Sequence, residues 1–275
     1  MPHRRTWRYS YILVDPPTAV FDSFDDFGRG LERLRELGYE GVEMPLAQPP
    51  GYGLESMQTA AERAGLKVAS LLTGWSYVHE GLALCSPDPA IRRGAVARLE
   101  DRVHLAASLG AIVVVGQMQG LSKDEPDAEA GNERIIEGLR QVCRTAENLG
   151  VTVVLEAVDH LSIGFNTTIA EVQEVGRHID SPAFRPMYDS FHANIEERST
   201  PEPIVRLGRD LGHVHLAETN GGPFGTGHLD FRAVLAALDE TRYAGWVSVK
   251  VYRYVSSWAE GAAGAMDYLR GIGAA

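Results

Sequence analysis

Residues 111–156, AIVVVGQMQGLSKDEPDAEAGNERIIEGLRQVCRTAENLGVTVVLE, show the pattern that decides the fold. Two short runs rich in β-branched residues, 111–117 and 151–156, flank a stretch over 132–149 whose apolar positions recur at helical spacing. That stretch stops at Gly150, and glycine is favoured just past the end of a helix. Near-continuous apolar runs are typical of parallel strands that are buried on both faces. The segment therefore predicts a strand, a helix and a second strand parallel to the first.

The same alternation extends over the whole chain. The runs that predict strands are 8–14, 41–45, 67–73, 111–117, 151–156, 184–189, 212–217 and 246–252. A second clear helical pattern covers 89–109 and ends before Gly110. Eight strand-and-helix repeats in 275 residues match a closed (β/α)₈ barrel, the TIM barrel of the α/β class. No linker or low-complexity tract divides the chain, so we expect one barrel domain over residues 1–275.

A doubly wound open sheet is the alternative fold. It would need a glycine-rich phosphate loop after its first strand, where this chain has Asp15-Pro16-Pro17-Thr18 instead. The sequence therefore favours the barrel.

Composition excludes several classes of protein. With 44% hydrophobic residues the chain is too apolar to be disordered. A net charge of −11 and the absence of a Lys/Arg run disfavour nucleic acid as a partner. Cys85 and Cys143 form no CxxC pair, and no apolar run is long enough for a signal peptide or a transmembrane helix. We expect a cytoplasmic protein that acts on a small molecule.

Polar residues stand at or just past the ends of the predicted strands. Chemistry in a (β/α)₈ barrel takes place at these ends. Any one polar residue there is explained equally well by a hydrogen bond at a strand–helix junction. Glu156, Asp189 and His215 follow three successive strands, and two carboxylates with one imidazole suit Mn²⁺, Co²⁺ or Mg²⁺. The residues at the strand ends are Glu43, Trp75, Gln117, Glu156, Asp189, His192, His215, Glu218 and Lys250.

Several motifs carry a family resemblance. They are GVE (41–43), SPD (86–88), VLE (154–156), YDSFHAN (188–194), HVHLAETN (213–220) and GTGHLDF (225–231). With them the chain resembles the sugar phosphate isomerase/epimerase family, the xylose isomerase-like barrels. That family includes ketose 3-epimerases, hydroxypyruvate isomerases and inosose dehydratases. The motifs indicate the fold more specifically than the substrate, because the family covers several reaction types.

The resemblance implies roles for individual residues. Glu156, Asp189 and His215 match three of four metal-ligand positions, Glu156 also matches an acid–base carboxylate, and His192 matches a position near the reacting carbon. The fourth ligand is a glutamate in the family, whereas this chain has Lys250 there. Lys250 could act as an acid–base group beside a three-ligand metal, its ammonium could occupy the place of the metal, or it could form a Schiff base with a keto-sugar.

Further residues are candidates for contact with the substrate. Asp159 and His160 are expected to orient the Glu156 carboxylate. No phosphate-binding motif is present, which favours a substrate without phosphate. The substrate-binding candidates are Glu43, Trp75, Gln117, His192, Glu218, His228 and Arg253.

We therefore expect an isomerase or epimerase of a keto-sugar or keto-cyclitol that transfers a proton through an enediolate with help from a divalent metal. Glu156, Lys250 and His192 are its expected catalytic residues. The alternatives are a lyase using the same site and a non-catalytic partner barrel. The related DNA-repair endonucleases are disfavoured by the acidic charge and by too few histidines at strand ends. The resemblance also implies a homodimer or homotetramer.

Overall fold

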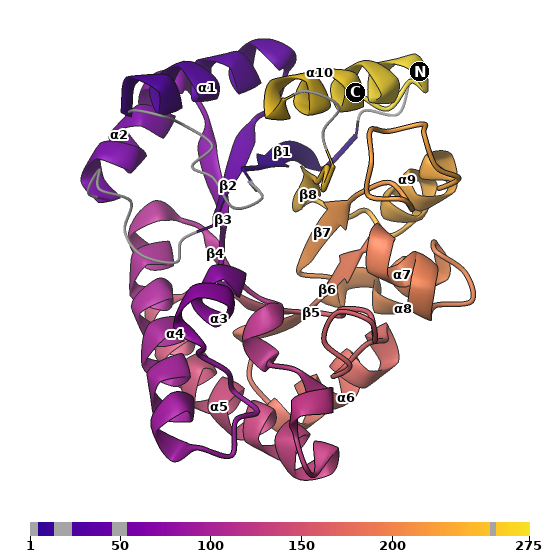
Figure 1. The fold of residues 1–275 in the computed structure, drawn as a ribbon. Helices are drawn as coiled ribbons and strands as arrows, with labels where there is room; N and C mark the ends of the chain where they lie inside the picture. Colours follow the sequence, from indigo (N-terminus) through magenta and orange to yellow (C-terminus); the bar gives the residue numbers. More distant parts are fainter. Residues whose placement is uncertain (1–4, 14–23, 46–53, 254–256) are drawn as a thin grey trace.

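A closed barrel of parallel strands forms the centre of the protein (Figure 1). The computed structural model describes residues 5–13, 24–45, 54–253 and 257–275, so the Asp15-Pro16-Pro17-Thr18 segment after the first strand lies outside the described residues. Strand β1 pairs with β8 and closes the barrel. The strands are β1 (Arg8–Ile12), β2 (Gly41–Pro45), β3 (Lys67–Leu72), β4 (Ile112–Val115), β5 (Val153–Glu156), β6 (Phe184–Asp189), β7 (His213–Leu216) and β8 (Trp246–Val249). The prediction of a TIM barrel is confirmed.

Helices surround the strands (Figure 1). The helix predicted over 89–109 has these bounds, and it ends at Gly110 with a φ of 64°. The other predicted helix starts earlier than expected, at Ala128, because Asp127 accepts a hydrogen bond from the Ala130 amide. The helices are α1 (Phe24–Leu37), α2 (Leu54–Ala64), α3 (Gly74–Glu80), α4 (Pro89–Leu109), α5 (Ala128–Leu149), α6 (Ile169–Ile179), α7 (Ser190–Glu196), α8 (Glu202–Leu207), α9 (Phe231–Glu240) and α10 (Trp258–Gly271). None of these helices in the described part of the chain is long and apolar enough to span a bilayer.

The inside of the barrel differs in polarity between its two sides. Val114, Val154 and Met187, from β4, β5 and β6, form a buried apolar cluster. On the other side, strands β1, β2, β7 and β8 bury polar residues that hydrogen bond to one another across the barrel. This polar side of the interior lies next to the charged residues at the carboxyl ends of the strands. These buried polar residues are Ser10, Glu43, His213, His215 and Ser248.

Candidate functional site

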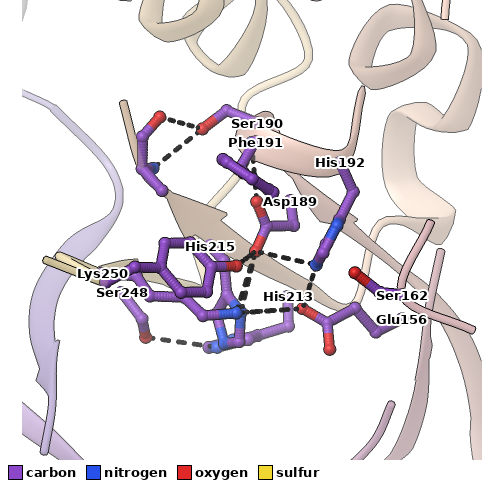
Figure 2. A network of polar contacts seen from close by, with 12 residues as sticks. Glu156, Ser162, Asp189, Ser190, Phe191, His192, His213, His215, Ser248 and Lys250 are labelled. Atoms are coloured by element: carbon purple, nitrogen blue, oxygen red, sulfur yellow. Dashed lines mark hydrogen bonds and ion pairs between the residues drawn. The ribbon is translucent and has the colours of Figure 1, made fainter. Parts of the chain in front are cut away.

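Glu156, Asp189 and His215 meet at the mouth of the barrel, as Figure 2 shows. Glu156 ends β5, Asp189 ends β6, and His215 lies on β7. His215 Nδ1 is 3.1 Å from Glu156 Oε1 and 3.4 Å from Asp189 Oδ2. Gly116 gives the Glu156 carboxylate room, because a Cβ at this position would lie 2.5 Å from Oε2. The strand ends thus bring together the three predicted metal ligands.

Lys250, one residue past β8, joins the same cluster. Its Nζ is 3.2 Å from Asp189 Oδ2, 3.6 Å from Glu156 Oε1 and 3.5 Å from His215 Nδ1. The Nζ also lies 4.5 Å from the centroid of the Tyr252 ring. The ammonium therefore contacts one atom of each predicted metal ligand.

His192, on α7, approaches the cluster from another direction. Its Nε2 is 4.0 Å from Glu156 Oε1 and 3.9 Å from Asp189 Oδ2. Its Nδ1 hydrogen bonds to Asp159 Oδ2 at 2.5 Å, and Asp159 also accepts hydrogen bonds from the Ser162 amide and hydroxyl. Asp159 thus orients His192 rather than Glu156, contrary to our expectation, because its loop turns it toward α7. His160 likewise pairs with Glu196.

Glu43 supports His215 from inside the barrel. Its Oε2 is 3.0 Å from His215 Nε2, while its Oε1 contacts His213 Nε2 and the Ser248 hydroxyl. Ser248 in turn hydrogen bonds to Ser10 at 2.5 Å. Because Glu43 Oε2 accepts a hydrogen bond from His215 Nε2, the other ring nitrogen, Nδ1, faces Glu156 and Asp189. Glu43 is fully buried, and in this arrangement it supports the site from below.

Electrostatic interactions in the cluster shift the pKa values of Asp189, Glu156, Lys250 and His215. Burial would raise the pKa of Asp189 and of Glu156, but Lys250 and the nearby histidines lower both below their usual values. Burial would lower the pKa of Lys250, but Tyr252, Glu156 and Asp189 raise it well above its usual value. Glu43 similarly outweighs burial and raises the pKa of His215. These shifts favour the charged forms of the two carboxylates, of the ammonium and of the His215 imidazole.

The donor atoms fit a divalent metal. Glu156, Asp189 and His215 each offer one ligand atom, and these atoms lie within 4.8 Å of one another. Metal–ligand bonds of ~2.1 Å at angles of 90–110° place neighbouring donors ~3.0–3.4 Å apart. The separations of 3.1 Å and 3.4 Å at His215 Nδ1 match this spacing. The cluster is therefore consistent with a divalent metal site that these three residues would form.

Four other predicted residues lie outside the charged cluster. Trp75, on α3, packs edge-on against the ring of His79, and Gln117 is exposed after β4. His228 is exposed, and its Nδ1 lies 3.2 Å from the Thr219 hydroxyl. Arg253 is exposed and donates a hydrogen bond to the carbonyl of Asn220. Their contact with a substrate remains a prediction.

Glu218 organises the loop that follows β7. Only 1% of its surface is exposed, and its carboxylate accepts hydrogen bonds from the amides of Thr219, Gly225 and Leu229. Burial would raise the pKa of Glu218, but the hydrogen bonds from these amides lower it. The side chain therefore serves as an acceptor for the loop backbone.

This arrangement predicts an acid-sensitive contribution to stability. The folded-state pKa of Glu218 lies below its ordinary value of 4.5, so its contribution is present above that pH and is lost as pH falls through the folded-state pKa. We expect Glu218→Gln to lower the free energy of unfolding by about 1–3 kcal/mol at pH 7, because the charged acceptor is lost. Urea unfolding at pH 7 and at pH 3 should show the difference shrinking at the lower pH. The exposed control for these measurements is Glu137→Gln. If Glu218→Gln lost the same free energy of unfolding at both pH values, relative to this control, the result would contradict this role of Glu218.

Several residues of the site were not among the candidates. His213 and Ser248 were overlooked, although His213 stands two residues before His215 and therefore faces the same side of β7. Gln119, rather than Gln117, donates a hydrogen bond to the carbonyl of Glu156. Asn166 then donates to Gln119 at 2.9 Å. His213 was predictable, because residues two apart on a strand face the same side. The contacts of Gln119 depend on the turn after β4 and were not predictable in this way.

Known proteins share this fold, and several are similar to this chain in sequence over most of its length. The chain is 29% identical to a ketose 3-epimerase of Arthrobacter globiformis over 83% of its own length and 78% of the relative. It is 27% identical to a D-psicose 3-epimerase of Ruminiclostridium cellulolyticum over 86% of each chain. The crystal structure of a D-allulose 3-epimerase from Methylomonas sp. in complex with D-allulose superposes with a TM-score of 0.82 at 20% identity, covering 98% of both chains. The profile of one family matches residues 31–272, nearly the whole barrel, and the chain belongs to that family, the xylose isomerase-like TIM barrels.

Proposed function

We propose that this protein is an isomerase or epimerase of a keto-sugar or keto-cyclitol, and that it moves a proton at the carbon next to the carbonyl group. The observation that carries the proposal is the convergence of Glu156, Asp189 and His215 beside the largely buried Lys250 ammonium at the barrel mouth. The names of the relatives, ketose 3-epimerase and D-psicose 3-epimerase, support the class of substrate. A substrate without phosphate fits the absence of a phosphate-binding motif from the sequence.

Each group has a role in proton transfer. Glu156 is ionised at neutral pH and accepts the proton from the carbon. Lys250, as an ammonium, stabilises the negative charge that develops on the carbonyl oxygen. His192, oriented by Asp159, moves protons to and from the sugar hydroxyls. A divalent metal held by Glu156, Asp189 and His215 would polarise the adjacent carbonyl and hydroxyl oxygens.

The distance between Glu156 and Lys250 affects whether the reaction can be an isomerisation or an epimerisation. Their charged atoms are 3.6 Å apart, so a substrate carbon does not fit between them in this arrangement. A single base on one face of the sugar supports transfer of a proton between neighbouring carbons, which is isomerisation. Epimerisation needs a second group on the opposite face, and Lys250 can supply it only after moving away from Glu156.

A lyase is the second candidate, and Lys250 is the observation that favours it. The ammonium lies 3.6 Å from the Glu156 carboxylate, and an N–H donor beside the reacting carbon can hydrogen bond to a hydroxyl or glycosidic oxygen as it leaves. Proton abstraction by Glu156 would then be followed by elimination rather than by return of the proton.

One experiment separates these functions. The protein is incubated in D₂O with Mn²⁺ and with a panel of ketoses, 3-keto-glycosides and inososes, and the products are followed by NMR. We expect deuterium at the carbon next to the carbonyl, together with an epimer or an aldose–ketose isomer. An α,β-unsaturated product would instead assign the protein as a lyase. If no compound exchanges a proton or yields a product, while an active family member assayed in parallel does, the proposal is wrong.

A further inference from the structure

The position of the Lys250 ammonium conflicts with metal binding by the donor group, by which we mean Glu156, Asp189 and His215. Its Nζ lies 3.2 Å from Asp189 Oδ2, 3.5 Å from His215 Nδ1 and 3.6 Å from Glu156 Oε1. These three residues are the ones whose ligand atoms lie within 4.8 Å of one another. One cation, covalently attached to the chain, thus already contacts one atom of each of the three residues that a divalent ion would need.

The structure holds this ammonium firmly. The amide of Lys250 donates a hydrogen bond to the carbonyl of Leu216, which fixes the backbone beside β7. The Tyr252 ring lies 4.5 Å from Nζ, and its hydroxyl donates to Asp189 Oδ2, the same oxygen that the ammonium contacts. The Phe191 ring packs against Tyr252 with centroids 4.9 Å apart. Only 12% of the Lys250 side chain is exposed.

Two cations cannot share these donors at close range. A divalent ion takes carboxylate and imidazole ligands at ~2.0–2.2 Å. Its charge would repel an ammonium that stays in contact with the same atoms, and the repulsion is weakly screened because the cluster is buried. The His215 nitrogen also has one lone pair, which a metal would use in full. Metal binding and the observed contacts of Lys250 therefore exclude each other.

We propose that Lys250 is a tethered cation that competes with a divalent metal for Glu156, Asp189 and His215, so that the metal binds only when the lysine side chain withdraws. Withdrawal also separates Lys250 from Glu156, which is the rearrangement that a substrate between the two would require. This inference rests on the proposed function only in using the same site. It predicts reciprocity, since a metal that displaces Lys250 must bind more tightly when Lys250 is absent.

The chain offers a clean test, because it contains three lysines, Lys67, Lys123 and Lys250. Chelator-treated protein is labelled with an amine-reactive reagent, with and without saturating Mn²⁺, and labelling is quantified for each lysine by peptide mass spectrometry. We expect Mn²⁺ to increase the labelling rate of Lys250 at least 10-fold. Labelling of Lys67 and Lys123, both exposed, should not change, so these residues are internal controls.

Binding measurements provide the second readout. The Kd for Mn²⁺ is measured by titration calorimetry on the wild type, on Lys250→Met and on the surface control Lys123→Met. We expect Lys250→Met, which keeps the length of the side chain without its charge, to bind Mn²⁺ at least 10-fold more tightly. Lys250→Glu, which adds a carboxylate, should bind more tightly still. The labelling test uses the wild type, so it decides the question even if a variant fails to fold.

The outcomes separate this inference from the proposed function. Equal Mn²⁺ affinity in the wild type and Lys250→Met, or Lys250 labelling that Mn²⁺ leaves unchanged, would overturn the competition even if the protein exchanges protons of a keto-sugar. The absence of Mn²⁺ binding in every variant would overturn it as well. Tighter binding by Lys250→Met together with Mn²⁺-dependent labelling would establish the competition, even if no keto-sugar reacts in the D₂O assay.

Discussion

Replacing Glu156 by glutamine is expected to slow deuterium exchange into a keto-sugar by about 10²- to 10⁴-fold, the range that a positioned acid–base group contributes. Glutamine has nearly the same size as glutamate, but it cannot accept the proton. The Glu156 carboxylate lies 3.1 Å from His215 Nδ1 and 3.6 Å from Lys250 Nζ, so no water layer separates it from the other charged groups. The rate is measured by NMR in D₂O with the keto-sugar that the wild type exchanges fastest.

Two variants make this prediction specific. Glu137→Gln changes an exposed carboxylate of α5 and should exchange at the wild-type rate. Asp189→Asn removes another carboxylate of the same donor group while leaving Glu156 in place. If Glu156 transfers the proton, Glu156→Gln should remain slower than Asp189→Asn when both are compared at equal metal content. Wild-type exchange by Glu156→Gln would exclude it as the base.

Replacing Glu43 by leucine should cause the largest loss of stability. Both carboxylate oxygens of Glu43 are used within the barrel, by His213 and Ser248 on one side and by His215 on the other. Leucine fills a similar volume but leaves two buried imidazoles and a hydroxyl without this acceptor. Removal of one partner from a buried charged network costs about 3–5 kcal/mol. Urea unfolding followed by circular dichroism at pH 7.5 measures the free energy of unfolding.

A milder variant separates charge from hydrogen bonding. Glu43→Gln keeps one carbonyl acceptor and should lose less stability than Glu43→Leu. It should also weaken Mn²⁺ binding by roughly 10- to 100-fold, since partners of a ligating histidine usually contribute this much. If Glu43→Leu stays within about 0.5 kcal/mol of the wild type, the range usual for a surface substitution, the buried network does not stabilise the fold.

Most of the fold could be predicted because its signals are local. Each strand begins within two residues of the predicted run, since apolar runs that are buried on both faces are visible in a short window. The bounds of α4 follow from its apolar periodicity and from the glycine at its end. The start of α5 was missed because its cap, Asp127, lies in a polar stretch that looks like a loop.

The part of the site that lies at the strand ends was predictable from the barrel topology. In a parallel barrel all strands end on one ring, so Glu156, Asp189 and His215, standing at the ends of successive strands, had to lie close together. The partners of His192 and Glu218 were not predictable in this way. Asp159 turns toward His192 and three loop amides turn toward Glu218 because of loop conformations that no periodic pattern records.

The sequence by itself determined the barrel, the order of its strands and the ring of residues at their carboxyl ends. These features depend on local hydrophobicity and on the rule that crossover connections between parallel strands are right-handed. Only the tertiary structure decided which charges pair. The sequence left three roles open for Lys250: an acid–base group beside a metal, an ammonium in place of the metal, and a Schiff base with a keto-sugar. The structure places its ammonium against Glu156, Asp189 and His215. Glu43 is 170 residues from His213 in the chain, yet the closed barrel brings them into contact. Such pairings depend on distances across the barrel, which the linear sequence does not contain.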